Sequence, residues 1–288
     1  MNSFDEKIIP GTIDAHQHLW QFDPVRDAWI TEDMKAIQRD FLANDLLEVL
    51  TESGVEGSIA VQADTSENET AFLVEQAERN DFIKGVVGWV DLCSPAVADR
   101  LAFYREGSRK IKGFRHIVQA EPDDNYLLRE DFCRGIAALG SLGFTYDILI
   151  YPKQLPAAIR FVEKFPDQRF VVDHLAKPLI REKRISPWAE QMNILSGHPN
   201  VFCKVSGMVT EADWQRWNAD ALRPYLDVVF ETFGPERLMF GSDWPVCLVA
   251  ASYREVIKVV RDYTGQLDPA ASAAVMGGNA RHFYQLEA

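Results

Sequence analysis

Two histidines near the start of the chain, His16 and His18, have a type and spacing that can do chemistry. The apolar residues before them, Ile8 through Ile13, predict a buried strand that ends near the pair. Because the two histidines are two positions apart, both imidazoles would leave such a strand on the same face. Neutral imidazoles can bind a metal ion or a substrate oxygen. His-x-His alone is a weak pattern, and two incidental histidines at a polar strand end would look the same.

Polar side chains also occur within or at the end of four later apolar segments. They are Arg115, Asp147, His174 and Asp243. Burying such groups costs free energy unless they are paired or serve a site. Each has a structural alternative: Asp243 could cap a turn or helix, and His174 could be a hydrogen-bonded core histidine. Arg115 could pair with a carboxylate, and Asp147 needs either a cation or a cavity. Their repeated occurrence at strand ends favours a shared site.

Three neighbouring residues are more ambiguous. Arg115 is followed by His116, and by alternation along a strand only one of them should face inward; we expect it to be Arg115. Lys177 lies just beyond the segment of His174 and is either a solvated loop charge or a substrate contact. Trp20 is either a pocket wall or ordinary packing.

The elements that must position these side chains alternate between strands and helices. After the first strand, further strands are predicted over residues 57–63, 83–92, 111–118, 144–150, 169–174, 201–206 and 237–243. Helices are predicted over residues 44–50, 68–79, 130–142, 155–165, 256–263 and 269–284, with another starting near Pro95. Eight apolar strands separated by helices indicate a parallel sheet buried on both faces. At 288 residues we expect one domain over residues 1–288, an α/β fold of the closed (β/α)8 TIM-barrel type rather than an open sheet. The strand ends would then meet at one mouth.

Composition and motifs narrow the functional classes. A net charge of -13 argues against nucleic-acid binding. The polar, acidic segment from Met1 to Lys7 does not resemble a signal peptide, and no apolar run is long enough for a membrane span. The four cysteines are far apart without Cys-x-x-Cys, which fits a reduced, cytoplasmic protein in which Cys203 and Cys247 fill the core. Nucleotide-binding glycine motifs and a Gly-x-Ser-x-Gly elbow are absent from the sequence.

Taken together, these motifs resemble the amidohydrolase superfamily, a metal-associated (β/α)8 group with His-x-His on the first strand and Asp on the eighth. More narrowly, they are similar to its sugar-lactone hydrolase branch, which includes L-fuconolactonase-like and L-rhamnonolactonase-like proteins. The segments that carry this resemblance are Ile13–Trp20, Lys112–Arg115, Asp147–Pro152, Asp173–Pro178 and Gly241–Pro245. They span nearly the whole chain.

The resemblance implies that His16, His18, His174 and Asp243 form the catalytic centre of an enzyme that hydrolyses an aldonolactone to the aldonic acid. Asp243 would be the general base that activates water. The histidines would polarise the lactone carbonyl, with or without one divalent ion. That ion, most simply Zn²⁺, would be held by His16, His18 and Asp243. A site with two metal ions is not expected, since neither the fourth nor the fifth strand ends in an inward lysine or glutamate.

Substrate contacts are expected from Arg115 and Asp147, which the resemblance implies, and from Trp20 and Lys177. The substrate would be a small sugar lactone of carbohydrate catabolism. The sequence does not choose among fuconolactone, rhamnonolactone, galactonolactone or a dicarboxylate lactone. Two alternatives remain: a metal-dependent decarboxylase of an aromatic or heterocyclic acid, and an inactive barrel used for binding. No nucleic-acid or membrane partner is expected. A homodimer is compatible with the sequence, although no segment argues for one.

Overall fold

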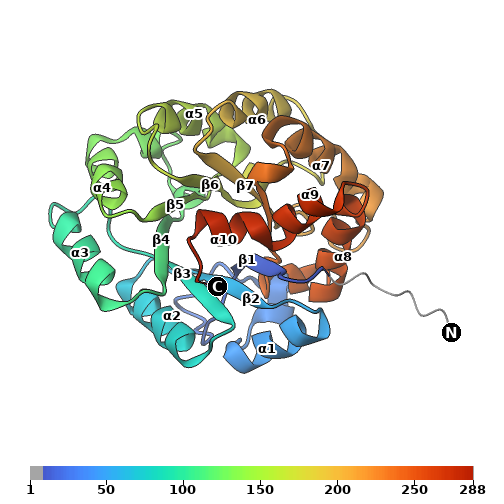
Figure 1. Ribbon diagram of the computed structural model, residues 1–288, viewed down its shortest axis with the longest axis horizontal. Helices are drawn as coiled ribbons and strands as arrows, with labels where there is room; N and C mark the ends of the chain where they lie inside the picture. The colour runs from blue at the N-terminus through green and yellow to red at the C-terminus, as the bar shows by residue number, and fades with distance from the viewer. Residues whose placement is uncertain (1–8, 288) are drawn as a thin grey trace.

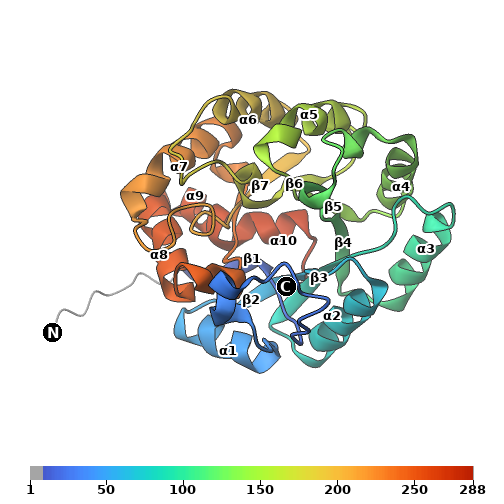
Figure 2. The same ribbon diagram turned by 180° about the vertical axis from the view of Figure 1, so that it is seen from behind.

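The computed structural model describes residues 9–287 of the chain. Eight parallel strands form one sheet in which neighbours in space are neighbours in sequence, from β1 to β8. The sheet curls into a barrel with helices around its outside, as two opposite views show (Figure 1 and Figure 2). The expected (β/α)8 barrel is therefore confirmed. The segment from Met1 to Lys7, which was not expected to be a signal peptide, lies outside the described residues. The same holds for Ile8, the first residue of the expected first strand.

The strands are short, and most are shorter than the apolar segments that predicted them. They are β1 (Ile13–Gln17), β2 (Gly57–Val61), β3 (Ile83–Gly88), β4 (Ile111–His116), β5 (Thr145–Ile148), β6 (Phe170–Val172), β7 (Val201–Val205) and β8 (Leu238–Phe240). The first strand starts at Ile13 rather than at Ile8, because Pro10 and Gly11 form a turn before it. At the other end, the last residues of several apolar segments leave the ladder and enter the loops that follow the strands.

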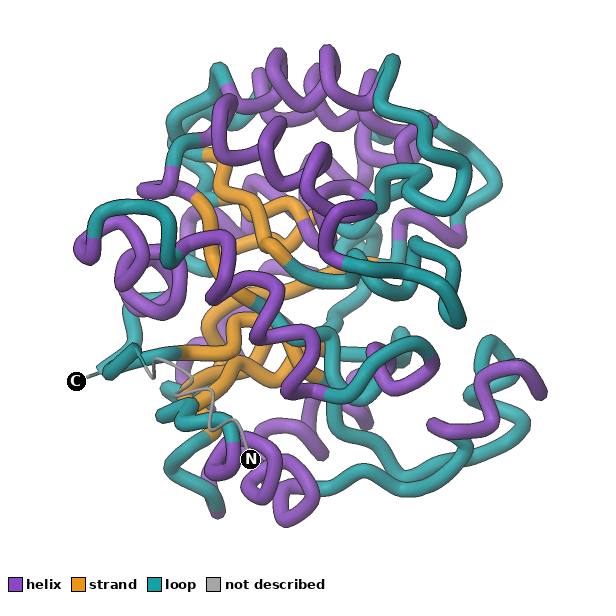
Figure 3. Tube along the Cα trace, turned by 90° about the vertical axis from the view of Figure 1, so that its right-hand side faces the viewer, coloured by secondary structure: helices purple, strands orange, loops and turns teal. Residues whose placement is uncertain are grey.

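Helices alternate with the strands and enclose them, which is visible from the side in Figure 3. They are α1 (Ala43–Glu52), α2 (Glu67–Arg79), α3 (Val97–Gly107), α4 (Glu130–Ser141), α5 (Leu155–Glu163), α6 (Trp188–Ser196), α7 (Ala219–Phe233), α8 (Tyr253–Thr264), α9 (Pro269–Ala273) and α10 (Asn279–Phe283). The sequence did not locate α6 and α7; α7 contains Pro224, a residue that usually ends a helix. Within residues 9–287, no helix is both long and apolar enough to cross a membrane.

The barrel has two apolar cores. A large cluster fills the space between the sheet and the surrounding helices. A smaller one lies inside the barrel and includes Ile59, Val87 and Met239 together with Phe283 and Tyr284 from the C-terminal segment. Helix α10 lies across one end of the barrel (Figure 1). The opposite end, where the strands finish, is therefore left for a site.

Two cysteines belong to this interior. Cys203, in β7, and Cys247 are fully buried free thiols, as their apolar neighbours predicted. Burial raises the pKa of both thiols, which keeps them protonated and unreactive.

The barrel closes where β8 returns to β1, and a buried carboxylate spans this seam. Asp14 accepts hydrogen bonds from the Ser242 N–H (2.9 Å), the Ser242 hydroxyl (2.6 Å) and the Tyr253 hydroxyl (3.1 Å). All three donors lie more than two hundred residues further along the chain. Asp14 therefore links the first strand to the segment that follows the last one.

Two backbone hydrogen bonds reinforce the same seam. His18 N–H donates to the Trp244 carbonyl (2.7 Å), and Asp243 N–H donates to the His16 carbonyl (2.8 Å). These bonds place the end of β1 directly beside the residues after β8. The two most separated parts of the chain are thus joined at the mouth of the barrel.

Replacing Asp14 by alanine should weaken this seam, because the Ser242 and Tyr253 donors would lose their acceptor inside the core. We expect the free energy of unfolding to fall by about 3 kcal/mol. Urea unfolding followed by circular dichroism measures this loss. The control is Asp262→Ala, which removes an exposed ion pair with Lys258 and should cost less than about 1 kcal/mol. Equal losses in the two variants would contradict the role of Asp14 in closure.

Candidate active site

Three imidazoles and one carboxylate meet at the mouth of the barrel. The Oδ1 atom of Asp243 lies 3.5 Å from His18 Nε2, 3.7 Å from His174 Nε2 and 4.0 Å from His16 Nε2. His16 lies in β1, His18 directly follows this strand, His174 follows β6, and Asp243 follows β8. The structure thus brings together all four residues that the sequence placed in a catalytic centre.

An unusual backbone turn after β6 presents His174. Four consecutive residues, from His174 to Lys177, have φ between 50° and 56°, in the left-handed region. Each such L-residue costs roughly 1–2 kcal/mol. The turn is held by Lys177 N–H, which donates to the His174 carbonyl (2.7 Å), and by the Trp188 indole, which donates to the Leu175 carbonyl (2.7 Å). The fold thus tolerates strain where it positions a site residue.

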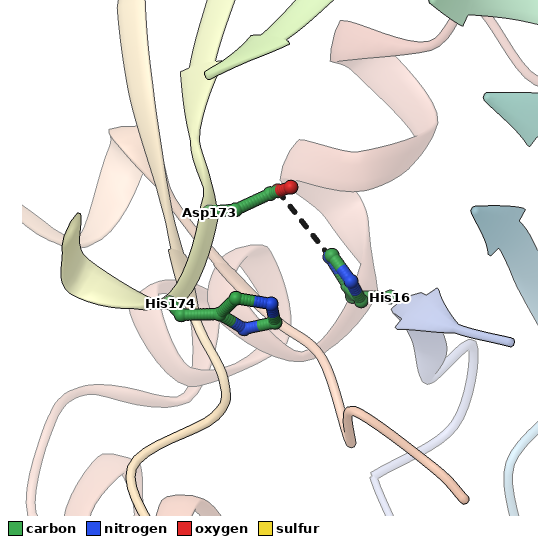
Figure 4. Close-up of side chains that lie close together, drawn as sticks. All are labelled: His16, Asp173 and His174. Carbon is green, nitrogen blue, oxygen red and sulfur yellow. Dashed lines mark ion pairs between the residues drawn. The ribbon is translucent and has the colours of Figure 1, made fainter. Parts of the chain in front are cut away.

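Close packing fixes the ring of His174. Gly207 has a φ of 64°, and a Cβ atom at this position would lie 2.6 Å from His174 Nδ1. The same Nδ1 lies 2.8 Å from the Ser206 hydroxyl. The ring orientation in Figure 4 therefore depends on the absence of a side chain at position 207.

The site opens into a cavity of about 280 Å³. One part of its lining is polar and consists of His18, Arg115, His174, Lys177, Asp243 and Gln119. The remainder is apolar and consists of Trp29, Ala63, Ile117, Ala120, Leu149 and Val246. The cavity could hold one small molecule with both polar and apolar edges.

Burial sets the protonation of the site. It lowers the pKa of His18, lowers that of His174 to about 4, and lowers that of His16 well below its usual range. Burial alone would raise the pKa of Asp243, but His174, His18 and Lys177 outweigh it, and the net pKa is lowered. At neutral pH the site therefore combines neutral imidazoles with an ionised carboxylate, the state a general base requires.

A buried charge cluster lies beside His16, and one of its members, Arg115, also reaches the cavity. The cluster consists of Lys204, Arg115, Asp147 and Asp173. Lys204 Nζ lies 2.5 Å from Asp147 Oδ2 and 3.0 Å from Asp173 Oδ1, and Arg115 Nη1 lies 2.9 Å from Asp173 Oδ2. The Tyr284 hydroxyl also donates to Asp147 Oδ2 (2.8 Å). With two cations and two carboxylates, the cluster compensates its own charge.

Two members of this cluster were not among the expected site residues. Lys204 is a lysine within the apolar segment 201–205, and that interruption was the available signal. Asp173 adjoins His174, and its carboxylate lies 3.3 Å from His16 Nδ1 (Figure 4). Sequence reasoning selected the histidine and passed over the neighbouring aspartate.

The expected substrate contact at Asp147 does not agree with its position. Its side chain is fully buried against Lys204 and Tyr284 and does not line the cavity. Of the two alternatives that the sequence left open, pairing with a cation is the one the structure has. The carboxylate therefore belongs to the charge cluster beside His16.

Trp20, a second expected substrate contact, does not line the cavity either. It is 4% exposed, and its indole donates to the Arg39 carbonyl (2.9 Å) rather than lining the cavity. Trp29 lines the cavity instead and packs edge-to-face on Trp20, with ring centroids 6.0 Å apart. Since both lie in the same aromatic loop, the sequence located the loop but not the residue.

Arg115 and Lys177 do line the cavity. Arg115 points inward, whereas its neighbour His116 turns away and lies 2.7 Å from Glu121, as alternation predicted. Lys177 Nζ is 3.5 Å from Glu211, a partner that the sequence did not indicate. Both cations therefore belong to the polar wall of the cavity, and the Arg115 guanidinium also donates to Asp173 and to the Gln62 carbonyl.

The donor set at the mouth fits one divalent cation. His18 Nδ1 lies 2.7 Å from the Val61 carbonyl and must donate to it, so His18 Nε2 carries a lone pair toward Asp243. Donor separations of 3.2 Å, 3.5 Å and 4.0 Å among His16, His18 and Asp243 suit ligands that surround one Zn²⁺ at about 2.0–2.2 Å. His16 joins this set only when its proton is on Nδ1.

A second group, His16, Asp173 and His174, also has the residue types of a metal site. Its aspartate, however, already faces two cations, with Lys204 Nζ 3.0 Å from Oδ1 and Arg115 Nη1 2.9 Å from Oδ2. The carboxylate of this second group is therefore already paired with cations of the protein, whereas that of Asp243 is surrounded by imidazoles.

Known proteins resemble this chain over nearly its whole length. Residues 13–286 match the amidohydrolase family. An L-fucono-1,5-lactonase of Burkholderia multivorans is 40% identical over 95% of this chain and 96% of its own length. The L-fucono-1,5-lactonase of Burkholderia ambifaria is 38% identical, with 96% of each chain covered.

Solved structures agree with this similarity. An amidohydrolase from Burkholderia multivorans with bound zinc superposes with a TM-score of 0.92 and 40% identity, covering 96% of this chain and 99% of its own. A probable 2-pyrone-4,6-dicarboxylic acid hydrolase from Acinetobacter baumannii has a TM-score of 0.79 at 17% identity, which indicates a shared fold.

The partly buried carboxylate of Glu69 accepts hydrogen bonds from the backbone at one edge of the cavity. Glu69, in the first turn of α2, accepts the backbone N–H groups of Ala63 (2.7 Å) and Asp64, and Ala63 lines the cavity. Burial raises the pKa of Glu69 to about 7. The folded chain therefore holds this proton at pH values where the unfolded chain has already released it.

This difference makes part of the stability depend on pH. Because the pKa of Glu69 is raised on folding, its contribution is present below about pH 4.5 and is lost as the pH rises through 7. Relative to Glu69→Gln, which does not titrate, the native chain should lose about 2 kcal/mol of unfolding free energy between pH 5 and pH 8. Urea unfolding of both proteins at the two pH values measures the change.

Glu67→Gln is the matched control, two residues away. Burial alone would raise the pKa of Glu67, but Arg100 and Tyr104 lower it overall, so this carboxylate is ionised in both states above pH 5. Its stability difference from the native chain should stay nearly constant over the same range. A difference for Glu69→Gln that is equally constant would show that Glu69 titrates normally.

Proposed function

The chain belongs to the amidohydrolase family of hydrolases, and on that premise we propose that it hydrolyses a sugar lactone to the open-chain aldonic acid. The observation that carries this proposal is that the Asp243 carboxylate lines the cavity and lies within 4.0 Å of the imidazoles of His16, His18 and His174. Whole-length similarity to two L-fucono-1,5-lactonases supports the same reaction.

Asp243 is the general base in this proposal. It lines the cavity and keeps its charge at neutral pH, so it can take a proton from a water molecule as that water attacks the lactone carbonyl carbon. The carbonyl electron pair moves to its oxygen in a tetrahedral intermediate. When this collapses, the bond from carbon to the ring oxygen breaks, and the ring oxygen takes the proton from Asp243. The products are an aldonic acid and the regenerated carboxylate.

The remaining polar groups stabilise charge and orient the substrate. The imidazoles of His16 and His174 lie around Asp243 and can polarise the carbonyl whose oxygen becomes negative. Lys177 and Arg115 offer cationic donors on the cavity wall to sugar hydroxyls and to the product carboxylate. When a divalent ion is bound by His16, His18 and Asp243, it supplies Lewis-acid polarisation of the same carbonyl.

The apolar wall favours a 6-deoxy sugar lactone. Trp29, Ile117, Leu149 and Val246 offer no polar side-chain partner other than the Trp29 indole N–H, and they suit a methyl group better than a hydroxymethyl group. Among the lactones compatible with the sequence, L-fuconolactone and L-rhamnonolactone carry such a methyl. We therefore take L-fucono-1,5-lactone as the first substrate to test.

Removal of the base tests the mechanism. Asp243→Asn keeps the shape of the side chain but cannot accept the proton, so kcat on L-fucono-1,5-lactone should fall roughly 10²- to 10⁴-fold with little change in KM. Release of acid, followed with a pH indicator in weak buffer, measures turnover. Asp262→Asn, on the exposed face of α8, serves as the control. Native protein that turned over no lactone in a panel of aldonolactones would refute the proposed reaction.

The apolar wall makes a separate prediction about specificity. The native enzyme should favour L-fuconolactone over L-galactonolactone, which adds a hydroxyl at C6, by roughly 10- to 100-fold in kcat/KM. Trp29→Ala should lower kcat/KM for L-fuconolactone and reduce this preference, whereas Phe103→Ala, an exposed aromatic residue on α3, should change neither value. If Trp29→Ala kept the full preference, the wall would not be the specificity element.

A further inference from the structure

A buried lysine touches the ring of His16 from behind the site. Lys204 is fully buried in β7, and its Nζ atom lies 3.1 Å from His16 Nδ1. The same ammonium contacts Asp147 and Asp173. An ammonium group has only donors, so its contact with His16 is favourable when Nδ1 carries a lone pair.

The other ring nitrogen of His16 shows where the proton then lies. His16 Nε2 is 3.2 Å from His18 Nε2. His18 Nδ1 donates to the Val61 carbonyl, so His18 Nε2 is an acceptor. A proton on His16 Nε2 therefore gives three consistent hydrogen bonds. Lys204 donates to His16 Nδ1, His16 Nε2 donates to His18 Nε2, and His18 Nδ1 donates to the Val61 carbonyl.

The opposite tautomer makes poorer contacts. A proton on His16 Nδ1 would face the Lys204 ammonium at 3.1 Å, and the lone pairs of His16 and His18 would face each other at 3.2 Å. Two other contacts favour this tautomer. Asp173 Oδ1, 3.3 Å from His16 Nδ1, could accept the proton on that nitrogen, and Arg115 Nη1, 3.3 Å from His16 Nε2, could donate to the lone pair there. Arg115 Nη1 already donates to Asp173 Oδ2 at 2.9 Å, so its contact with His16 is secondary.

We propose that Lys204 is a positioning residue that holds His16 as the tautomer with its proton on Nε2. His16 Nε2 then carries an N–H that is directed at His18 Nε2, rather than a lone pair. This tautomer does not depend on any substrate and is therefore tested separately from the proposed function. It also opposes metal binding, because an ion at His16, His18 and Asp243 requires the proton to move to Nδ1, against Lys204.

Nuclear magnetic resonance of the native protein tests the tautomer directly. Protein labelled with ¹⁵N-histidine and freed of metal by a chelator should give a two-bond ¹H–¹⁵N pattern for His16 with the proton on Nε2. His16→Gln identifies the signals by their loss. A proton on Nδ1 in the metal-free native protein would overturn the proposal, and no lactone is involved in this outcome.

A charge-conserving double variant tests the part that Lys204 plays. Lys204→Met with Asp147→Asn removes one cation and one carboxylate together, so net charge is kept and neither partner is left buried alone. The matched control applies the same two substitutions, Lys153→Met with Asp124→Asn, to an exposed ion pair of 2.7 Å. The Lys204 variant should shift His16 to the tautomer with the proton on Nδ1, and the control should not.

Zinc affinity gives a second readout that is independent of activity. Titration calorimetry with zinc chloride should show at least tenfold tighter binding to the Lys204 double variant than to the native protein. The control pair should bind zinc like the native protein. If the Lys204 variant kept both the native tautomer and the native zinc affinity, Lys204 would not position His16. If the Lys204 variant failed to fold, the proposal would be judged by the native protein alone: a proton on His16 Nε2 would support it, and a proton on Nδ1 would overturn it.

Discussion

The site depends on the closure of the barrel between its first and last strands. His16 and His18 leave β1, while Asp243 follows β8, so these groups are adjacent only when the sheet has joined its own ends. Asp14 and two backbone hydrogen bonds make that join. Because the bonds involve the same residues that carry the imidazoles and the carboxylate, closing the fold and assembling the reactive groups are one event.

Much of this arrangement could be predicted from the sequence, because it follows from simple regularities. Apolar segments alternating with helices indicated a parallel barrel, and the rule that strands end at one mouth brought His16, His18, His174 and Asp243 together. The partners of buried groups could not be predicted in this way. Whether Asp147 meets a cation or a cavity depends on Lys204, a residue 57 positions away, and on how the two strands face each other.

The choice between Trp20 and Trp29 has a similar origin. Both lie in one irregular loop, where no period tells which side chain points inward. The left-handed turn from His174 to Lys177 is likewise invisible in a sequence without glycine there, since non-glycine residues rarely adopt such angles. Regular elements were thus predictable, whereas loop geometry and buried ion pairing depend on the complete fold.

The position of Tyr284 has a consequence for how the interior of the barrel is held together. Its ring belongs to the small apolar cluster inside the barrel, and its hydroxyl donates to the buried carboxylate of Asp147 (2.8 Å). A single side chain therefore fills apolar space and satisfies a buried charge. Because these two contributions reside in different atoms, removing the hydroxyl alone would disturb the polar layer and leave the packing of the ring in place.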